Sequence, residues 1–262
     1  MHRTHEHRSI DYYSYGSGIG NWNAVYKVLF SVGALVTVIA ADSIRVSAVT
    51  ILFMLYLSVG AGRLSLRTYI RLMAIPAAFL LMGGAAIMLQ PGSAADGLVH
   101  IRFFYIKLYI TNDSLVLAGN VTFKALAAVS ALYMMTLSTP MGEILSVLRR
   151  IHVPALLLEL MHLIYRYIFI LSEINQKQKD AAKSRLGYCD MRTSFRTFGS
   201  EAANLFILSI KKSEMYYDAM EARGYEGNGL FWEERKALTG KQLLYGFLYV
   251  ILIILAVGGG VE

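Results

Sequence analysis

The sequence predicts an all-α integral membrane protein with about five transmembrane helices and a region of amphipathic helices inserted before the last one. Three observations favour this class. The chain of 262 residues is 56% hydrophobic, above the roughly 45–50% of a soluble domain. Its mean hydropathy is +0.48. Its apolar residues also gather into runs close to the roughly 17–25 residues that a membrane-spanning helix needs.

Five apolar runs are the candidate spans. Only a short polar stretch with Asp42, Ser43 and Arg45 separates the first two, so we expect a tight helical hairpin. Lys124 falls within the fourth run. Because a cation at the bilayer centre costs about 2.5–3.5 kcal/mol, its side chain should face protein or snorkel to the interface. The five runs are Val25–Ala41, Ile44–Gly60, Leu72–Gln90, Leu115–Ser138 and Leu243–Val257.

The distribution of positive charge predicts the orientation, because Lys and Arg concentrate in cytoplasmic loops. Residues 139–242 hold fifteen of the 25 Lys and Arg residues, and the connection after the second span adds Arg63, Arg67 and Arg71. An odd number of spans then places the N-terminus in the cytoplasm and the C-terminus outside a cell (inner or plasma) membrane. The predicted division is a cytoplasmic N-terminal segment (1–23), helices one to four (24–138), a cytoplasmic helical region (139–242) and the last span with the C-terminus (243–262).

The connection between the third and fourth spans lies outside in this topology. Its segment Val99–Ile110 is rich in aromatic and β-branched residues, which suit either an interfacial helix or a strand. Arg102 and Lys107 depart mildly from the positive-inside rule. The pattern leaves the choice between helix and strand open.

Apolar residues at helical spacing predict three or four amphipathic helices between residues 139 and 242. Pro140 and Pro154 bound a short helix that contains Arg149 and Arg150. Two longer helices follow, and no Gly/Ser-rich or Pro-rich run marks a linker. Their apolar faces carry Leu157, Met161, Ile164, Ile168 and Leu171 in the first, and Phe206, Ile210, Ser213, Tyr217 and Met220 in the second.

Both longer helices are predicted to end in an arginine, a glycine stop and a tyrosine. The endings read Ser184-Arg185-Leu186-Gly187-Tyr188 and Ala222-Arg223-Gly224-Tyr225. A basic residue and a glycine are also the ordinary way to end a helix, since they suit the macrodipole and the left-handed turn. Two copies about one helix hairpin apart favour a functional interpretation. An arginine on a rigid helix end makes bidentate bonds to carboxylates, so the pair predicts docking into acidic grooves of another protein.

These endings resemble the paired Ala-Arg-Gly motifs of the T component of energy-coupling factor (ECF) transporters. The second ending matches closely, whereas the first has serine in place of alanine, and Leu186 lies between its arginine and its glycine. The N-terminal Ile10–Tyr15, followed by Asn21–Asn23 and Lys27, resembles the opening of the cobalt-transport subgroup, CbiQ. The resemblance covers nearly the whole chain.

The resemblance implies a transmembrane coupling subunit of an importer of the ATP-binding-cassette (ABC) type. Residues 139–242 would be a coupling-helix region that docks into two ABC-type ATPase subunits and passes their motion to a separate substrate-binding membrane (S) subunit. ATP would be bound by the partner subunits, the metal by the partner membrane subunit, and no cofactor by this chain. The residues that would make the ATPase contacts and turns are Ser184, Arg185, Gly187, Ala222, Arg223 and Gly224.

The residues themselves agree with a chain that performs no catalysis. Gly240 and Lys241 lack the upstream glycine of a P-loop, and Cys189 is the single cysteine. The mixed charge of residues 139–242 makes a poor nucleic-acid surface. A lipid-modifying membrane enzyme would need His, Asp or Glu within the spans, and a channel or self-contained carrier would need polar residues along a pore. The spans offer little beyond Lys124 and scattered Ser and Thr.

The substrate stays open at this point. The N-terminal likeness favours cobalt, with nickel or a vitamin as alternatives. His2, His5 and His7 are potential metal ligands, although a terminal segment rarely builds a defined site and a polar tail is the simpler interpretation. For His152 and His162, with Glu159 and Arg166 nearby, we expect solvated or interfacial positions.

Overall fold

The computed structural model describes residues 10–91, 99–103, 106–225 and 236–258. The chain divides into two units. Unit 1 comprises residues 1–144 and 234–262, and unit 2 comprises residues 145–233. Unit 2 is thus one continuous insertion in the sequence of unit 1. The assignment of the predicted segments to membrane and cytoplasm stays a prediction.

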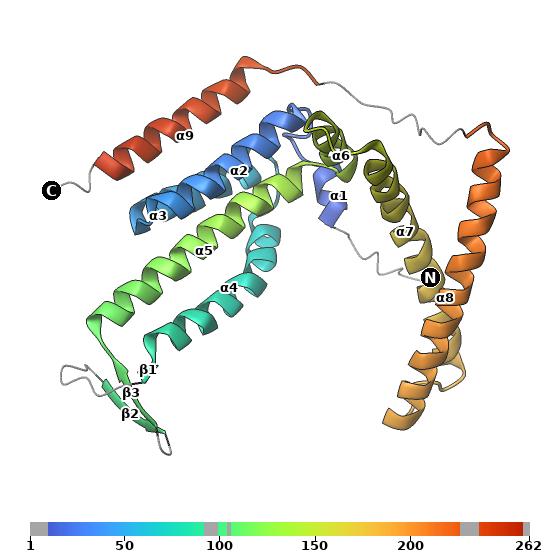
Figure 1. Cartoon of the computed structure of the whole chain (residues 1–262). Coiled ribbons are helices and arrows are strands. Elements are labelled where there is room, and N and C mark those ends of the chain that lie inside the picture. Colours follow the sequence, from blue (N-terminus) through green and yellow to red (C-terminus); the bar gives the residue numbers. More distant parts are fainter. Residues whose placement is uncertain (1–9, 92–98, 104–105, 226–235, 259–262) are drawn as a thin grey trace. The chain divides into compact units, whose positions relative to one another are not determined.

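Unit 1 is a helical bundle (Figure 1). Its members are α1 (Ile10–Tyr15), α2 (Ala24–Ala41), α3 (Ile44–Leu55), the π-helical turn η1 (Tyr56–Ala61), α4 (Leu66–Met88), α5 (Asn112–Ser138) and α9 (Gly240–Gly258). The helix α5 packs against α1, α2, α3 and α4, while α9 packs against α2 and α3. The bundle is therefore organised around α5.

The five predicted spans are all present as helices, with α3 and η1 together forming the second. Two of them begin earlier than predicted because polar residues cap them. The Ser65 side chain accepts a hydrogen bond from the Thr68 N–H at 3.2 Å and starts α4. Thr111 and Ser114 form a reciprocal capping box that starts α5.

A sixth helix is also long and apolar enough to cross a membrane. This helix is α7 (Ala155–Ser184), which the sequence interpretation placed in the cytoplasmic region. The all-α membrane class is confirmed, and the described residues contain six candidate spans rather than about five. Length and composition alone do not separate α7 from the other five.

The segment between α4 and α5 forms a small antiparallel sheet. Its strands are β1 (Gln90–Pro91), β2 (Val99–Phe103) and β3 (Ile106–Ile110), in the order β1-β3-β2. In the β2–β3 register Val99 pairs with Ile110 and Phe103 with Ile106. The open choice for residues 99–110 is thus decided in favour of strands.

Small residues and one aromatic cluster form the centre of unit 1. Ala127 and Ala131 of α5 are fully buried, and their short side chains let neighbouring helices approach closely. Phe30, Phe53 and Tyr249 bring α2, α3 and α9 together, with ring centroids 5.2–6.2 Å apart. The sequence periodicity did not predict this pairing of the last span with the first hairpin.

Lys124 does not stand alone in the apolar fourth span. Its Nζ lies 2.8 Å from Oδ1 of Asp42, the residue that ends α2. Asp42 is largely exposed, so the pair lies at an end of the bundle. The prediction that this cation faces protein or reaches the interface is confirmed.

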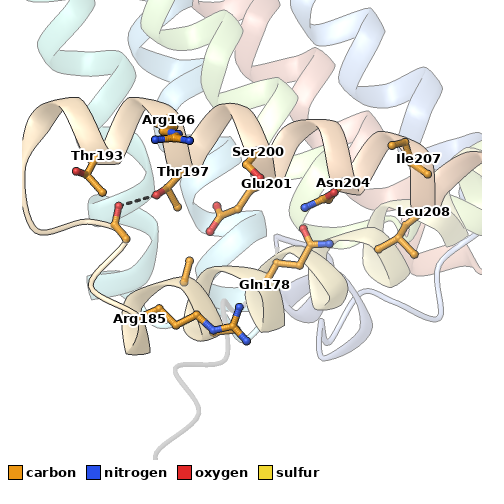
Figure 2. Close-up of a pocket in the computed structure, with 13 residues that line it drawn as sticks. Gln178, Arg185, Thr193, Arg196, Thr197, Ser200, Glu201, Asn204, Ile207 and Leu208 are labelled. Carbon is orange, nitrogen blue, oxygen red and sulfur yellow. Dashed lines mark hydrogen bonds between the residues drawn. The ribbon is translucent and has the colours of Figure 1, made fainter.

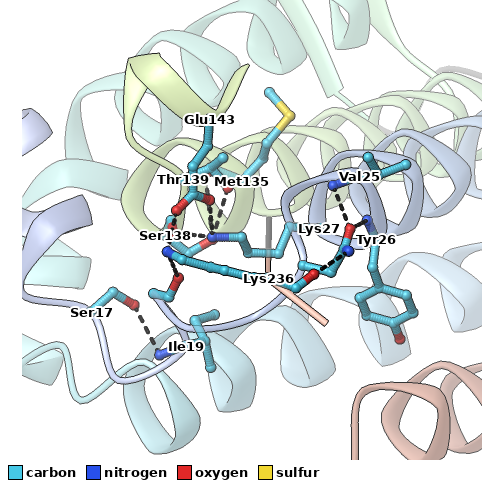
Figure 3. A network of polar contacts seen from close by, with 12 residues as sticks. Ser17, Ile19, Val25, Tyr26, Lys27, Met135, Ser138, Thr139, Glu143 and Lys236 are labelled. Carbon is cyan, nitrogen blue, oxygen red and sulfur yellow. Dashed lines mark hydrogen bonds and ion pairs between the residues drawn. The ribbon is translucent and has the colours of Figure 1, made fainter. Parts of the chain in front are cut away.

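A cluster of charges joins three separate segments of unit 1 (Figure 3). Glu143 accepts from Lys27 Nζ at 2.8 Å through Oε2 and from Lys236 Nζ at 2.6 Å through Oε1. Lys27 is fully buried and also donates to the Ser138 carbonyl at 2.8 Å, while Lys236 donates to the Gly20 carbonyl at 2.8 Å. A buried ammonium needs such partners, because removing it from water without them is very unfavourable.

Asn23 adds a second connection between the same segments. Its Oδ1 accepts from the N–H groups of Val25 and Tyr26 at 3.0 and 3.3 Å, which caps α2. Its Nδ2 donates to the Lys236 carbonyl at 2.7 Å. The chain passes into unit 2 just after Glu143 and returns just before Lys236. Both connections to unit 2 are therefore fastened to the start of α2.

Of the three or four amphipathic helices predicted between residues 139 and 242, three are present among the described residues. They are α6 (Met141–Arg150), which begins in unit 1, then α7, and α8 (Met191–Glu221). The helices α7 and α8 run antiparallel as a hairpin (Figure 1). No residue of α8 is buried within the described structure, and in α7 only Leu158 and Glu159 are. The hairpin therefore has little core of its own.

The charge cluster generates a stability prediction. Glu143→Gln leaves the ammonium of Lys27 buried without its anion, so we expect the free energy of unfolding to fall by about 3 kcal/mol. The measurement is detergent denaturation followed by circular dichroism. Glu173→Gln is the matched control, because the Glu173–Lys177 pair is exposed and should contribute little. Equal effects of the two substitutions would contradict the prediction.

Candidate functional site

The first arginine ending closes α7 with a two-bond motif. The N–H of Gly187 donates to the Ala182 carbonyl at 2.9 Å, and the N–H of Leu186 donates to the Lys183 carbonyl at 3.1 Å. Leu186 has a positive φ of 58°. This is a Schellman motif, in which a left-handed residue reverses the chain and satisfies the last helical carbonyls. Arg185 is the residue just before the reversal, and it is exposed.

The second ending closes α8 in the same way. The N–H of Tyr225 donates to the Met220 carbonyl at 3.1 Å, and the N–H of Gly224 donates to the Glu221 carbonyl at 2.9 Å. Gly224 has a φ of 78° and is the left-handed residue. Arg223 precedes it and is exposed. The two arginines thus occupy equivalent positions in two copies of one motif.

The structure corrects the sequence alignment of the two endings. Sequence comparison predicted that Gly187 is the stop and that Leu186 is an intervening residue. In the structure Leu186 occupies the left-handed position of Gly224, and Gly187 corresponds to Tyr225. A left-handed backbone is unfavourable for leucine, so α7 ends with local strain that α8 avoids.

Gly187 is required for a different reason: Thr197 of α8 lies too close to its backbone for a side chain to fit easily. A Cβ at this position would lie 3.0 Å from both the Ala182 carbonyl oxygen and Thr197 Oγ1. Thr197 also donates to the Gly187 carbonyl at 2.8 Å (Figure 2). Gly187 therefore lets the start of α8 pack against the end of α7.

The other predicted site residues have simple structural roles. Ser184 Oγ donates to the Asp180 carbonyl at 3.0 Å, and the Ala222 N–H donates to the Asp218 carbonyl at 2.9 Å. Both residues are exposed. Small side chains at these positions leave the neighbouring arginines accessible.

A groove lies between α7 and α8 beside the first ending (Figure 2). Its volume is about 790 Å³, and both Arg185 and Arg196 line it. Gln178 and Glu201, also in its lining, each have a buried Oε1 without a hydrogen-bond partner among the described residues. The groove therefore holds two polar oxygens that are not satisfied by the described residues.

The tyrosine after each ending contacts the opposite helix. Tyr188 donates to Glu201 Oε2 at 2.6 Å, which connects the end of α7 to α8. Tyr225 donates to Glu159 Oε1, which connects the end of α8 to α7. His152 and His162 are exposed, as expected, whereas the neighbouring Glu159 is only 8% exposed. The hydrogen bonds to the glutamates are the largest cause of a raised pKa at Tyr188 and at Tyr225, and desolvation adds to it.

The structure keeps the two arginines apart and places each before a left-handed turn, and Arg185 also lines the groove. Arg185 lies at the turn between α7 and α8, and Arg223 lies at the far end of α8. Sequence reasoning noted the trailing tyrosines but missed Glu159 and Glu201 as their partners. A single sequence holds no signal for these pairs, because they form only when the two helices are side by side.

The described residues contain no group of three or more His, Cys, Asp or Glu that could hold a metal ion. His2, His5 and His7 lie outside the described residues. Cys189 is exposed, and its Sγ donates to Asp190 Oδ1 at 3.3 Å. The candidate functional features of α7 and α8 are therefore the two arginine endings and the groove.

These features define a multi-pass α-helical membrane protein with an inserted helical hairpin that carries paired arginines. A family model described as CbiQ, cobalt transport protein, matches residues 19–236. The chain belongs to the CbiQ family of cobalt transport proteins, and it is a non-catalytic component of a transporter of the ECF type.

Individual relatives agree with this family. A putative fused cobalt transport protein CbiMQ of Methanocorpusculum labreanum is 28% identical over 96% of this chain, and the chain spans only 42% of that protein's length. An uncharacterized protein of Methanocaldococcus jannaschii is 26% identical over 96% of this chain and 93% of its own length. The cobalt transport protein CbiQ of Salmonella typhimurium is 29% identical over 63% of this chain and 74% of its own length.

The left-handed turns predict opposite effects for two glycine substitutions in the same helix. Gly224→Ala forces alanine into a positive φ and should lower the free energy of unfolding by about 1 kcal/mol. Gly199→Ala, inside α8 with no atom near the new Cβ, should raise it by about 0.5–1 kcal/mol. Chemical denaturation of both variants measures the difference, and the same sign for both would contradict the prediction.

The Tyr188 hydrogen bond predicts a pH dependence. The folded-state pKa of Tyr188 is raised above 10.0, so its stabilising effect is complete below pH 10 and is lost as the pH rises through the folded-state pKa. We therefore expect wild type to be more stable than Tyr188→Phe at pH 8 and to lose this advantage at strongly alkaline pH. Denaturation curves across this range test it, and a constant difference would argue against the assignment.

Proposed function

We propose that this chain is the transmembrane coupling (T) subunit of an ECF-type ABC importer and that cobalt ion is its most favoured cargo. In this role it transmits the motion of two ABC-type ATPase subunits to a separate substrate-binding membrane (S) subunit. In this proposal the chain itself binds no cofactor, and ATP is bound by the partner ATPase subunits. Membership of the CbiQ family supports this role.

The observation that carries the proposal is the equivalence of Arg185 and Arg223. Each is exposed, and each precedes the left-handed residue of a Schellman motif at the end of a long helix. A guanidinium held in this way projects past the last turn and suits a carboxylate-lined groove. Two equivalent mounts fit two copies of one partner, which supports one ATPase subunit at each arginine. Ser184, Gly187, Ala222 and Gly224 complete the two contact surfaces.

The charge distribution supports the orientation. We infer that unit 2 lies in the cytoplasm with the N-terminus and that the C-terminus lies outside. Residues 139–242 hold most of the basic residues, and the ATPases that would bind them act in the cytoplasm. This topology also places the Lys124–Asp42 pair and the β1–β3 sheet at the outer ends of the helices.

The names of the relatives support cobalt as the cargo and a membrane protein as a partner. The relative from Methanocorpusculum labreanum is a fused cobalt transport protein, and more than half of its length lies outside the match. A fusion of this kind suggests that the matched part works in contact with a second transport protein. Nickel and a vitamin are the alternative cargoes, and uptake assays with all three distinguish them.

Charge reversal at the second ending tests the docking role. Arg223→Glu should weaken binding of the ATPase subunits by at least about 30-fold, which is about 2 kcal/mol, because it places a carboxylate against an acidic groove. Metal uptake should fall to background while the protein still inserts into the membrane. Copurification from detergent and uptake in proteoliposomes measure the two effects.

Lys211→Glu is the matched control for this experiment. It makes the same charge change at an exposed position in the middle of α8. Binding and uptake should stay near the wild-type level in this variant. Wild-type uptake by Arg223→Glu, or an equal loss in both variants, would refute docking through Arg223.

A further inference from the structure

We propose that Tyr188 and Tyr225 are positioning residues that hold Arg185 and Arg223 at a fixed separation on the α7–α8 hairpin. The inference rests on the proposed function, because the separation matters only if both arginines dock. Each tyrosine follows one of the arginines in the sequence and donates a hydrogen bond to a glutamate of the other helix. The two contacts lie at opposite ends of the hairpin.

The hairpin depends on such contacts because hydrophobic burial within it is small. Among the described residues α8 has none that is buried, and α7 has Leu158 and Glu159. Beside the first ending, a groove of about 790 Å³ lies between the two helices (Figure 2). Apolar burial is non-directional and here sparse, so directional contacts determine how the helices lie against each other.

A single contact between α7 and α8 would not fix the angle between the two helices. The rings of Tyr167 in α7 and Tyr216 in α8 have centroids 5.4 Å apart. Two rods that touch at one point still pivot about it. The Tyr188–Glu201 bond lies on one side of this point and the Tyr225–Glu159 bond on the other. Together with the Thr197–Gly187 hydrogen bond at the turn, these three contacts fix the angle between the helices and hence the distance between the arginines.

The distance matters for a subunit that engages two partners at once. The 30-residue helix α7 is roughly 45 Å long at 1.5 Å per residue, so the arginines are mounted far apart. Once one arginine has docked, the second docking is intramolecular, and its effective concentration depends on how well the spacing matches. A pivoting hairpin would lose this advantage and would absorb motion instead of transmitting it.

Pulsed electron paramagnetic resonance on the full chain tests the positioning role. Spin labels go on Lys183 and Ala219, exposed residues close to the two arginines, after Cys189→Ser removes the exposed native thiol. We expect a narrow distance distribution that Tyr225→Phe broadens by about twofold. Tyr15→Phe, at an exposed tyrosine outside the hairpin, should leave it unchanged.

The partner glutamate separates positioning from a general loss of folding. Glu159→Leu removes the acceptor and should broaden the distribution as Tyr225→Phe does. Glu159→Gln keeps an acceptor oxygen at the same place and should restore the narrow distribution. The double variant Tyr225→Phe/Glu159→Leu should be no broader than either single variant, since both remove one contact.

Transport by the reconstituted complex gives the functional readout. In Tyr188→Phe and Tyr225→Phe we expect the substrate moved per ATP hydrolysed to fall by at least about fivefold while the ATPases stay bound. Unchanged distances and unchanged coupling in both variants would overturn the inference. If the wild-type chain bound no ABC ATPase, the proposed function would fail, and the distance measurement on the chain alone would still show whether the tyrosines fix the hairpin.

Discussion

The rest of this structure depends on the two ion pairs that the carboxylate of Glu143 makes. This carboxylate accepts from a fully buried lysine through one oxygen and from Lys236 through the other. Lys27 brings the first membrane helix to this point, and Lys236 brings the segment that leads into the last one. Both connections to unit 2 thus pass through residues next to this cluster.

Units 1 and 2 are stabilised in different ways. Unit 1 has an interior of small residues and aromatic rings around α5, which suits a stable bundle in lipid. The α7–α8 hairpin has few buried residues and is held by individual hydrogen bonds and ring contacts. Such an element has low local stability, so its geometry depends on those few directional contacts.

Much of this fold follows from the sequence, because spans and amphipathic helices depend on local patterns. The runs of apolar residues found α2, α3, α4, α5 and α9, and the 3.6-residue rhythm found α7 and α8. The sequence could not decide on β2 and β3, since aromatic and β-branched residues suit both alternatives. It also could not separate α7 from a true span by composition.

The candidate site was predictable in its residues and not in its geometry. The Arg-Gly pattern identified both endings, yet the first was aligned one residue off, because a glycine was expected wherever a helix stops. Leu186 takes the left-handed position, and Gly187 is needed for its small size beside Thr197. The partners of Tyr188 and Tyr225 depend on residues tens of positions away, and only the folded hairpin brings them together.

Because both connections to unit 2 lie next to the carboxylate of Glu143, unit 2 can be exchanged for that of a related protein. The chain leaves unit 1 next to Glu143 and returns next to Lys236, which form an ion pair. The inserted stretch can therefore be replaced without changing where its two ends join unit 1. A chimaera of two such proteins should be cut on the unit 2 side of Glu143 and Lys236. The recipient then keeps its own Glu143 cluster, while the inserted helices come from the donor.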